Sequence, residues 1–166
     1  MAEEDQEDGL EEAFTMIEQY TDEPISGQWV SNECFVFINK KGNINYLIEG
    51  RVMKLGSSGK KQYILGYDSK QNRLYLVDKA LNVYAHRLLM SVLNFQAAIM
   101  NGETEKALVM KSSIPESQHG KLAKFLETNG QKQMAFDMTP DLDHKFELAL
   151  GLNKVDDAFK IALESD

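Results

Sequence analysis

The spacing of apolar residues changes once along this chain, near Leu88, and this change restricts the folds that the chain can adopt. Between Trp29 and about Leu89, short β-prone runs alternate with turns rich in Gly, Asn, Asp and Ser. Beyond this point apolar residues recur at every third or fourth position, as in Leu88, Val92, Phe95 and Ile99. The pattern predicts an α+β protein with antiparallel strands first and helices second.

The first part contains six β-prone runs, so we expect six strands. The runs are CFVFI (34–38), INYLI (44–48), RVMKL (51–55), KQYILGY (61–67), RLYLV (73–77) and NVYAHRL (82–88). No stretch between them is long enough for a crossover helix, which favours an antiparallel meander of the kind found in sandwiches, barrels and propellers. Before the first run, Pro24 and Gly27 are expected to break the chain's pattern, and Trp29 is expected to anchor the core.

The second part predicts a helix from Leu88 to the stop at Asn101-Gly102, then helices at about 104–112, 115–128, 131–138, 141–150 and 154–164. A weak repeat runs through them. An alanine followed by an apolar residue comes after each of three dipeptides. These pairs are Ala107-Leu108 after Asn101-Gly102, Ala135-Phe136 after Asn129-Gly130, and Ala158-Phe159 after Leu152-Asn153. In the third copy the glycine has moved to Gly151, which suits a helix C-terminus. A left-handed corner followed by a small residue at a helix crossing is typical of an α-solenoid of helix–turn–helix repeats.

The acidity of the chain is concentrated at residues 1–8, which contain five acidic residues and no Lys or Arg. The whole chain has a net charge of −8, and without these five acids it would have −3. We expect a disordered acidic tail at 1–8, a short amphipathic helix at 10–20 within a β-meander domain at 9–88, and a solenoid at 89–166. The chain has no basic stripe for nucleic acid or anionic lipid, no long apolar run and no secretory signal, which favours a cytosolic protein.

Several motifs could carry chemistry, and each has a simpler explanation. Gly56-Ser57-Ser58-Gly59-Lys60 lacks the spacing of a phosphate loop and precedes a strand, so we interpret it as a solvent-exposed hairpin. Asp141, Asp143, His144 and Glu147 could begin a metal site, but an acidic first turn of a helix explains them as well. His86, His119 and the single cysteine, Cys34, have no partner at a signature spacing, and Lys40-Lys41 and Lys60-Lys61 fall in turns. The sequence assigns no catalytic, metal or cofactor-binding residue and no cofactor.

From Gly27 onward the sequence resembles the coatomer β′ family. The resemblance rests on GQWVSNECFVF, NINYLIEGRV, YILGYDSKQNRLYLVDKALNV and LLMSVLNFQAAIMNGE in the first part and on SIPESQHGKLAKFLETNGQKQMAF and DLDHKFELALGLNKVDDAFKIAL in the second. It implies the end of a second WD-repeat propeller followed by the start of the α-solenoid, although no Gly-His or Trp-Asp blade signature is present. It also implies that the first propeller, which binds dilysine signals on cargo, is missing.

The resemblance implies a non-catalytic structural piece of the COPI vesicle coat, peripheral to Golgi and vesicle membranes, in traffic between Golgi and endoplasmic reticulum. Its partners would be other coatomer subunits, especially the α subunit solenoid. Alternatives are an α-type or intraflagellar-transport-type scaffold, a cytosolic binding module whose strands enclose a small-molecule pocket, and a hydrolase using His144 and Glu147. Open ends on the strands and on the helical array predict self-association or marginal stability.

Overall fold

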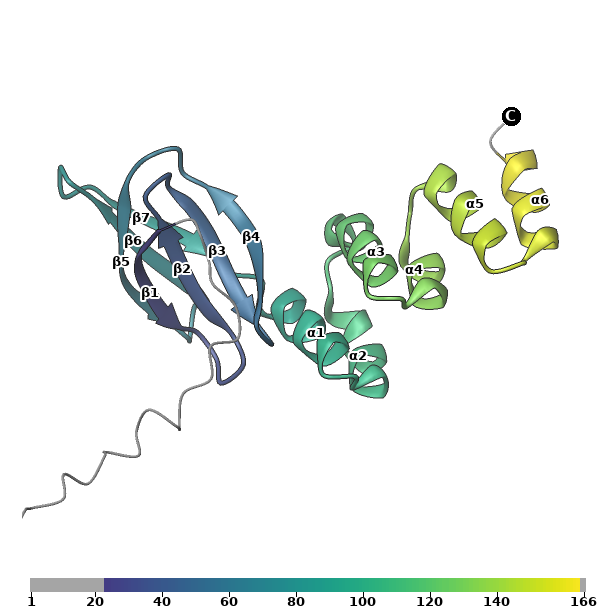
Figure 1. Cartoon of the computed structure of the whole chain (residues 1–166), viewed down its shortest axis with the longest axis horizontal. Helices are drawn as coiled ribbons and strands as arrows, with labels where there is room; N and C mark the ends of the chain where they lie inside the picture. The colour runs from purple at the N-terminus through teal and green to yellow at the C-terminus, as the bar shows by residue number, and fades with distance from the viewer. Residues whose placement is uncertain (1–22, 165–166) are drawn as a thin grey trace, which may run out of the picture.

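The computed structural model describes residues 23–164, and the expected acidic tail and the helix at 10–20 lie outside this range. Two antiparallel sheets come first and a row of helices follows, so the predicted α+β order is confirmed (Figure 1). One sheet contains β1 (Pro24–Trp29), β2 (Phe35–Asn39), β3 (Asn43–Ile48) and β4 (Arg51–Ser57) in that order. The other contains β5 (Gln62–Asp68), β6 (Arg73–Asp78) and β7 (Val83–Arg87).

The prediction of six strands missed β1, which forms where Pro24 and Gly27 were expected to break the chain. Pro24 is tolerated because it begins a strand at the edge of the sheet. Gly27 is needed there because a Cβ atom would come within 2.4 Å of the Phe35 ring. Trp29 contacts Phe35 with a ring separation of 5.2 Å but is 61% exposed, so its predicted role as a core anchor is wrong.

The turns place the two sheets against each other. Glu49 and Gly50 both have positive φ, which makes a tight hairpin between β3 and β4. The hairpin predicted at Gly56–Lys60 is instead a crossing between sheets, because the connection at residues 58–61 leaves the first sheet and enters the second. The backbone N–H of Ile64 donates to Ser26 Oγ at 2.8 Å and joins β5 to β1.

Six helices follow, and they agree closely with the predicted segments. They are α1 (Met90–Met100), α2 (Thr104–Met110), α3 (His119–Thr128), α4 (Lys132–Met138), α5 (Leu142–Gly151) and α6 (Val155–Glu164). Short 3-10 turns at Lys111–Ser113 and Glu116–Gln118 join α2 to α3. None of the helices within residues 23–164 is both long and apolar enough to cross a membrane.

The helices pair through three corners of the same construction. After α1, Gly102 has a φ of +75°, its N–H donates to Ile99, and the N–H of Glu103 donates to the carbonyl of Ala98. This is the Schellman arrangement, which satisfies the last carbonyls of a helix. The same two bonds recur after α3, where the left-handed residue is Gly130, and after α5, where it is Asn153.

The repeat predicted from the sequence is therefore present in the backbone. The alanine after each corner lies where the two helices of a pair pack together, and it has almost no exposed surface. Ala107 and Ala135 are 0% exposed and Ala158 is 3% exposed. One detail is corrected. Gly151 is still helical and ends α5, whereas the left-handed corner is Asn153, because Asn tolerates positive φ better than most residues.

Helix α1 belongs to both hydrophobic cores. Its Leu93 and Ala97 are buried with side chains of the two sheets, including Val36, Ile38 and Leu74. Its Phe95, Ala98 and Ile99 are buried with side chains of α2–α6. The sheets and the helices are thus connected by packing on both sides of one helix, and the domain boundary predicted after residue 88 stays a prediction.

Candidate interaction surfaces

Helix α6 is the last helix that the structure describes (Figure 1). It carries the clearest unpartnered surface among the described residues, a row of apolar side chains. Val155, Phe159 and Leu163 are 68%, 65% and 63% exposed, and their spacing of four residues places them along one side of the helix. Ala158 and Ile161 face the core and are almost fully buried. We call the exposed row the α6 stripe. An apolar row of this kind marks a protein-binding surface when it is contiguous.

A partly buried polar network lies between α3 and α5. His144 Nε2 lies 2.9 Å from Glu127 Oε2, and His144 Nδ1 lies 3.1 Å from Thr139 Oγ1. The side chain of Asp141 accepts from the N–H groups of Asp143 and His144 and caps α5, as the acidic first turn predicted. The partner of His144 is therefore Glu127 on the previous helix pair, not Glu147 as the hydrolase alternative required.

This network resembles a hydroxyl–imidazole–carboxylate arrangement, but its geometry favours a structural role. Thr139 is only 5% exposed, and its Oγ1 also accepts from the N–H of Asp141 at 3.4 Å. A nucleophile must be reachable by substrate. Thr139, Asp141 and His144 line an open hollow of about 260 Å³, but Thr139 itself has almost no exposed surface. Within residues 23–164 no group of three His, Cys, Asp or Glu side chains is placed to hold a metal ion. The network joins consecutive helix pairs.

The other residues considered from sequence are spread over the fold. His86 lies on β7, His119 begins α3, and Cys34 is 2% exposed before β2. Burial raises the pKa of the Cys34 thiol to about 11, so the thiol is protonated at neutral pH. In the loop that resembled a phosphate loop, Ser58 Oγ bonds to the carbonyls of Gly42 and Lys60, and a strand follows.

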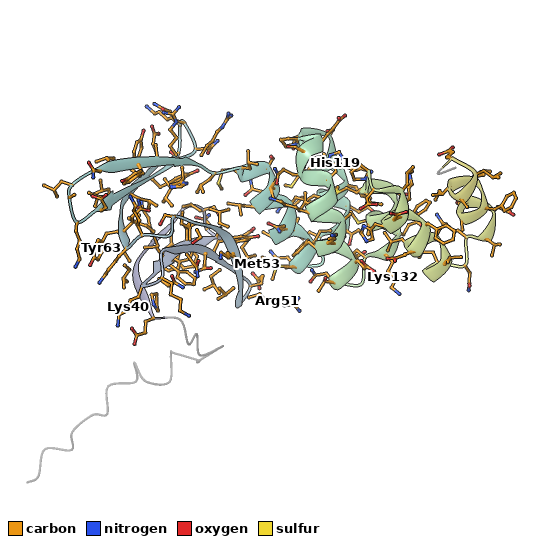
Figure 2. All side chains as sticks on the ribbon, turned by 90° about the horizontal axis from the view of Figure 1, so that it is seen from above. Lys40, Arg51, Met53, Tyr63, His119 and Lys132 are labelled. Carbon is orange, nitrogen blue, oxygen red and sulfur yellow. The ribbon has the colours of Figure 1, made fainter. Side chains whose placement is uncertain are left out.

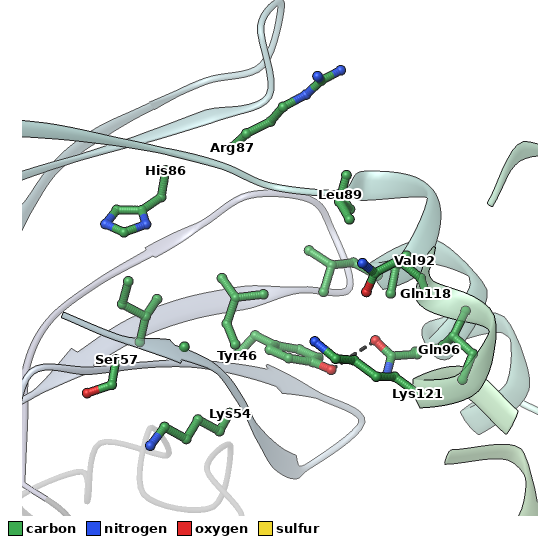
Figure 3. A pocket seen from close by; sticks show the side chains of 15 residues that line it. Tyr46, Lys54, Ser57, His86, Arg87, Leu89, Val92, Gln96, Gln118 and Lys121 are labelled. Carbon is green, nitrogen blue, oxygen red and sulfur yellow. Dashed lines mark hydrogen bonds between the residues drawn. The ribbon is translucent and has the colours of Figure 1, made fainter. Parts of the chain in front are cut away.

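A pocket of about 530 Å³ lies between the sheets and the helices (Figure 3). Its walls come from β3, β4, β7, α1 and α3, so it is not enclosed by strands as the binding-module alternative expected. Its charged lining residues among those described are Lys54, Arg87 and Lys121, with His86 beside them and no Asp or Glu. The sequence analysis missed this set because the three cations come from separate elements.

One hydrogen bond at this pocket connects the sheets to the helices. The hydroxyl of Tyr46 on β3 donates to Gln96 Oε1 on α1 at 2.9 Å, and both residues are buried (Figure 3). Burial raises the pKa of the Tyr46 hydroxyl. A second contact lies at the same end of the sheet, where Arg51 Nη1 donates to Asn129 Oδ1 at 2.8 Å (Figure 2).

The corners, the buried alanines and the paired helices define a helical-repeat protein joined to antiparallel sheets. Comparison with known proteins agrees, because residues 95–166 match the family model described as the COPA/B TPR domain. Over 160 residues, 96% of its length, the chain is 38% identical to the probable coatomer subunit β′ of Caenorhabditis elegans and spans 16% of that protein. Identity to coatomer subunit β′ is 38% over 97% of the chain for Drosophila melanogaster and 37% over 96% for Homo sapiens, with 18% of each relative covered.

The chain is thus homologous to the coatomer β′ subunits over nearly its whole length, which confirms the resemblance found in the sequence. The chain corresponds to less than a fifth of the length of these relatives.

Proposed function

We propose that this chain is a non-catalytic structural segment of a COPI-type vesicle coat that works through contacts between proteins. In this proposal it serves in transport between Golgi and endoplasmic reticulum and reaches Golgi and vesicle membranes only through the coat. The observation that carries the proposal is the α6 stripe, three large apolar side chains that lie in a row on the last described helix pair and are more than 60% exposed. The homology to coatomer β′ supports the kind of assembly.

The partner we propose is another coatomer subunit, with the helical region of the α subunit as the first candidate. Helical repeats present their apolar faces to neighbouring helices, and burying a Phe side chain contributes about 1.5–3 kcal/mol. The stripe is also a source of the self-association that the sequence predicts, because in the absence of a partner two copies can cover the same face. The domain division at residue 88 fits this proposal, with the solenoid part making the contact.

The test is isothermal titration of the purified chain with the purified helical region of the coatomer α subunit. Phe159→Asp removes the centre of the α6 stripe and leaves the buried side of α6 intact. We expect it to weaken binding by about 2 kcal/mol or more, the loss typical of a hot-spot residue at the centre of an interface. Val109→Asp is the matched control, because Val109 is 78% exposed on α2, away from the stripe. Equal binding by Phe159→Asp and the original chain would reject the stripe as the contact.

A further inference from the structure

The pocket between the sheets and the helices has a charge pattern that the coat proposal does not use. Lys54 comes from β4, Arg87 from the end of β7 and Lys121 from α3, and all three are exposed. The floor is formed by buried or half-buried groups, with the Tyr46–Gln96 pair and Leu93 among them. We call this pocket, bordered by Lys54, Arg87 and Lys121, the basic groove.

The arrangement of the cations favours an extended ligand. Figure 3 shows Lys54 and Arg87 on opposite sides of the groove, with the guanidinium of Arg87 directed away from Tyr46. A compact anion could not contact both, whereas an extended chain with several carboxylates can contact one cation after another. The β4 and β7 strands that border the groove are also the edges of their sheets, and edge strands offer free backbone groups to an added extended segment.

The chain itself contains a segment with the complementary charge. Residues 1–8 include Glu3, Glu4, Asp5, Glu7 and Asp8, and no basic residue. We propose that this acidic segment, residues 3–8, binds in the basic groove of the same molecule as an extended chain. The groove would then be covered by the protein's own residues until a stronger acidic ligand or high salt displaces them.

The described structure begins close enough to the groove for this contact. The carbonyl of Glu23 accepts from the N–H of Lys40, and in the same turn the carbonyl of Gly42 accepts from the N–H of Ser58 at 2.9 Å. Ser57, the neighbour of Ser58, lines the groove. The 14 residues from 9 to 22 can span up to about 45–50 Å when extended. A tether of this length also gives a local concentration on the order of millimolar.

The test uses a spin label on the full chain. Gln6→Cys introduces a thiol within the acidic segment without removing a charge, and it can be labelled selectively because Cys34 is buried and its pKa is raised to about 11. We expect paramagnetic broadening of the amide signals of Ser57, His86 and Lys121, and none in α6. The broadening should fade in 0.5 M salt, because screening weakens contacts between exposed charges.

Two variants decide whether the groove cations are responsible. Lys54→Gln/Arg87→Gln/Lys121→Gln should lower the docking equilibrium roughly 3-fold to 100-fold, from the small contribution of each exposed ion pair. The control Lys70→Gln/Lys79→Gln/Lys132→Gln removes the same charge from exposed positions elsewhere and should leave the broadening unchanged. Absence of broadening at the groove, or equal broadening in the groove variant, would overturn the proposal.

A mixed sample separates contact within one chain from contact between two. Isotope-labelled chain without the spin label is combined with spin-labelled chain that carries no isotope. The proposal predicts no broadening of groove signals in this mixture. Broadening there would assign the acidic segment to the groove of a second copy and would overturn docking within the same molecule.

Discussion

The hydrogen bond between Tyr46 and Gln96 should contribute strongly to the free energy of unfolding, because both partners are buried. Tyr46 is 5% exposed and Gln96 is 7% exposed, so water can replace a lost partner only from the pocket that both residues line. Tyr46→Phe leaves the Gln96 oxygen without its donor, and Gln96→Leu leaves the Tyr46 hydroxyl with only the weaker acceptor Met53 Sδ at 3.5 Å. Each change should lower the free energy of unfolding by about 1–3 kcal/mol, the cost of an unsatisfied buried polar group.

The double variant Tyr46→Phe/Gln96→Leu removes both polar groups while keeping similar volumes. Its cost should be smaller than that of either single variant, about 0–1 kcal/mol, because two apolar groups then meet where two polar ones did. The coupling energy of the cycle should therefore be at least about 1 kcal/mol. Tyr84→Phe is the control: its hydroxyl donates to Asp78 on the surface of the sheet, and we expect a cost within about 0.5 kcal/mol.

Urea unfolding measures these free energies with two probes, fluorescence of Trp29 for the sheets and circular dichroism for the helices. Since α1 packs in both cores, the two probes should report one transition in the original chain. In the single variants the two transitions should separate, because the bond that connects β3 to α1 is broken. Additive costs in the double variant, with no coupling, would refute this reasoning.

Three further changes test the helical repeat and the buried cysteine. Ala135→Leu should destabilise the chain by about 1–3 kcal/mol in thermal unfolding, because Ala135 is 0% exposed where α3 and α4 pack, whereas Gln133→Leu on the exposed side of α4 should change little. Asp141→Ala should cost about 1 kcal/mol by removing the cap of α5, and Asp141→Asn should restore most of it; equal losses would contradict the capping role. The pKa of Cys34 is about 11 in the folded chain against an ordinary value of 9.0, so the unfolded chain loses this proton first, and stability should fall as pH rises from about 9 to about 11. Cys34→Ala should show a smaller fall in urea midpoint over this range, and an identical fall would contradict the assignment.

The repeat could be predicted from sequence because its physical requirements are local. A corner needs a residue that adopts positive φ readily, and the glycines at positions 102 and 130 can be recognised in the sequence for this reason. The fourth residue of the next helix must be small. Ala107 in α2 and Ala135 in α4 meet this condition and have no exposed surface. Local bonding thus fixes the helix boundaries to within a few residues.

The errors arise where a distant residue decides. The β1 strand was missed because Gly27 is selected by the Phe35 ring, which comes from the neighbouring strand. The hairpin expected at Gly56–Lys60 is instead a crossing between sheets, because no local pattern indicates which sheet the next strand joins.

The candidate surfaces show the same limit. The spacing of Val155, Phe159 and Leu163 is visible in sequence, but that of Leu122 and Leu126, which are fully buried, is the same. Only the packing distinguishes an inner face from an outer one. Glu127 was likewise not recognised as the partner of His144, because the two residues lie on different helix pairs.

Hydrogen–deuterium exchange with the purified helical region of the coatomer α subunit tests the central claim most directly. If the chain acts in a coat through its last helices, added partner should slow exchange in residues 150–164 and leave β2–β7 unchanged. Exchange that stays the same throughout the chain, or slows only in the strands, would contradict it.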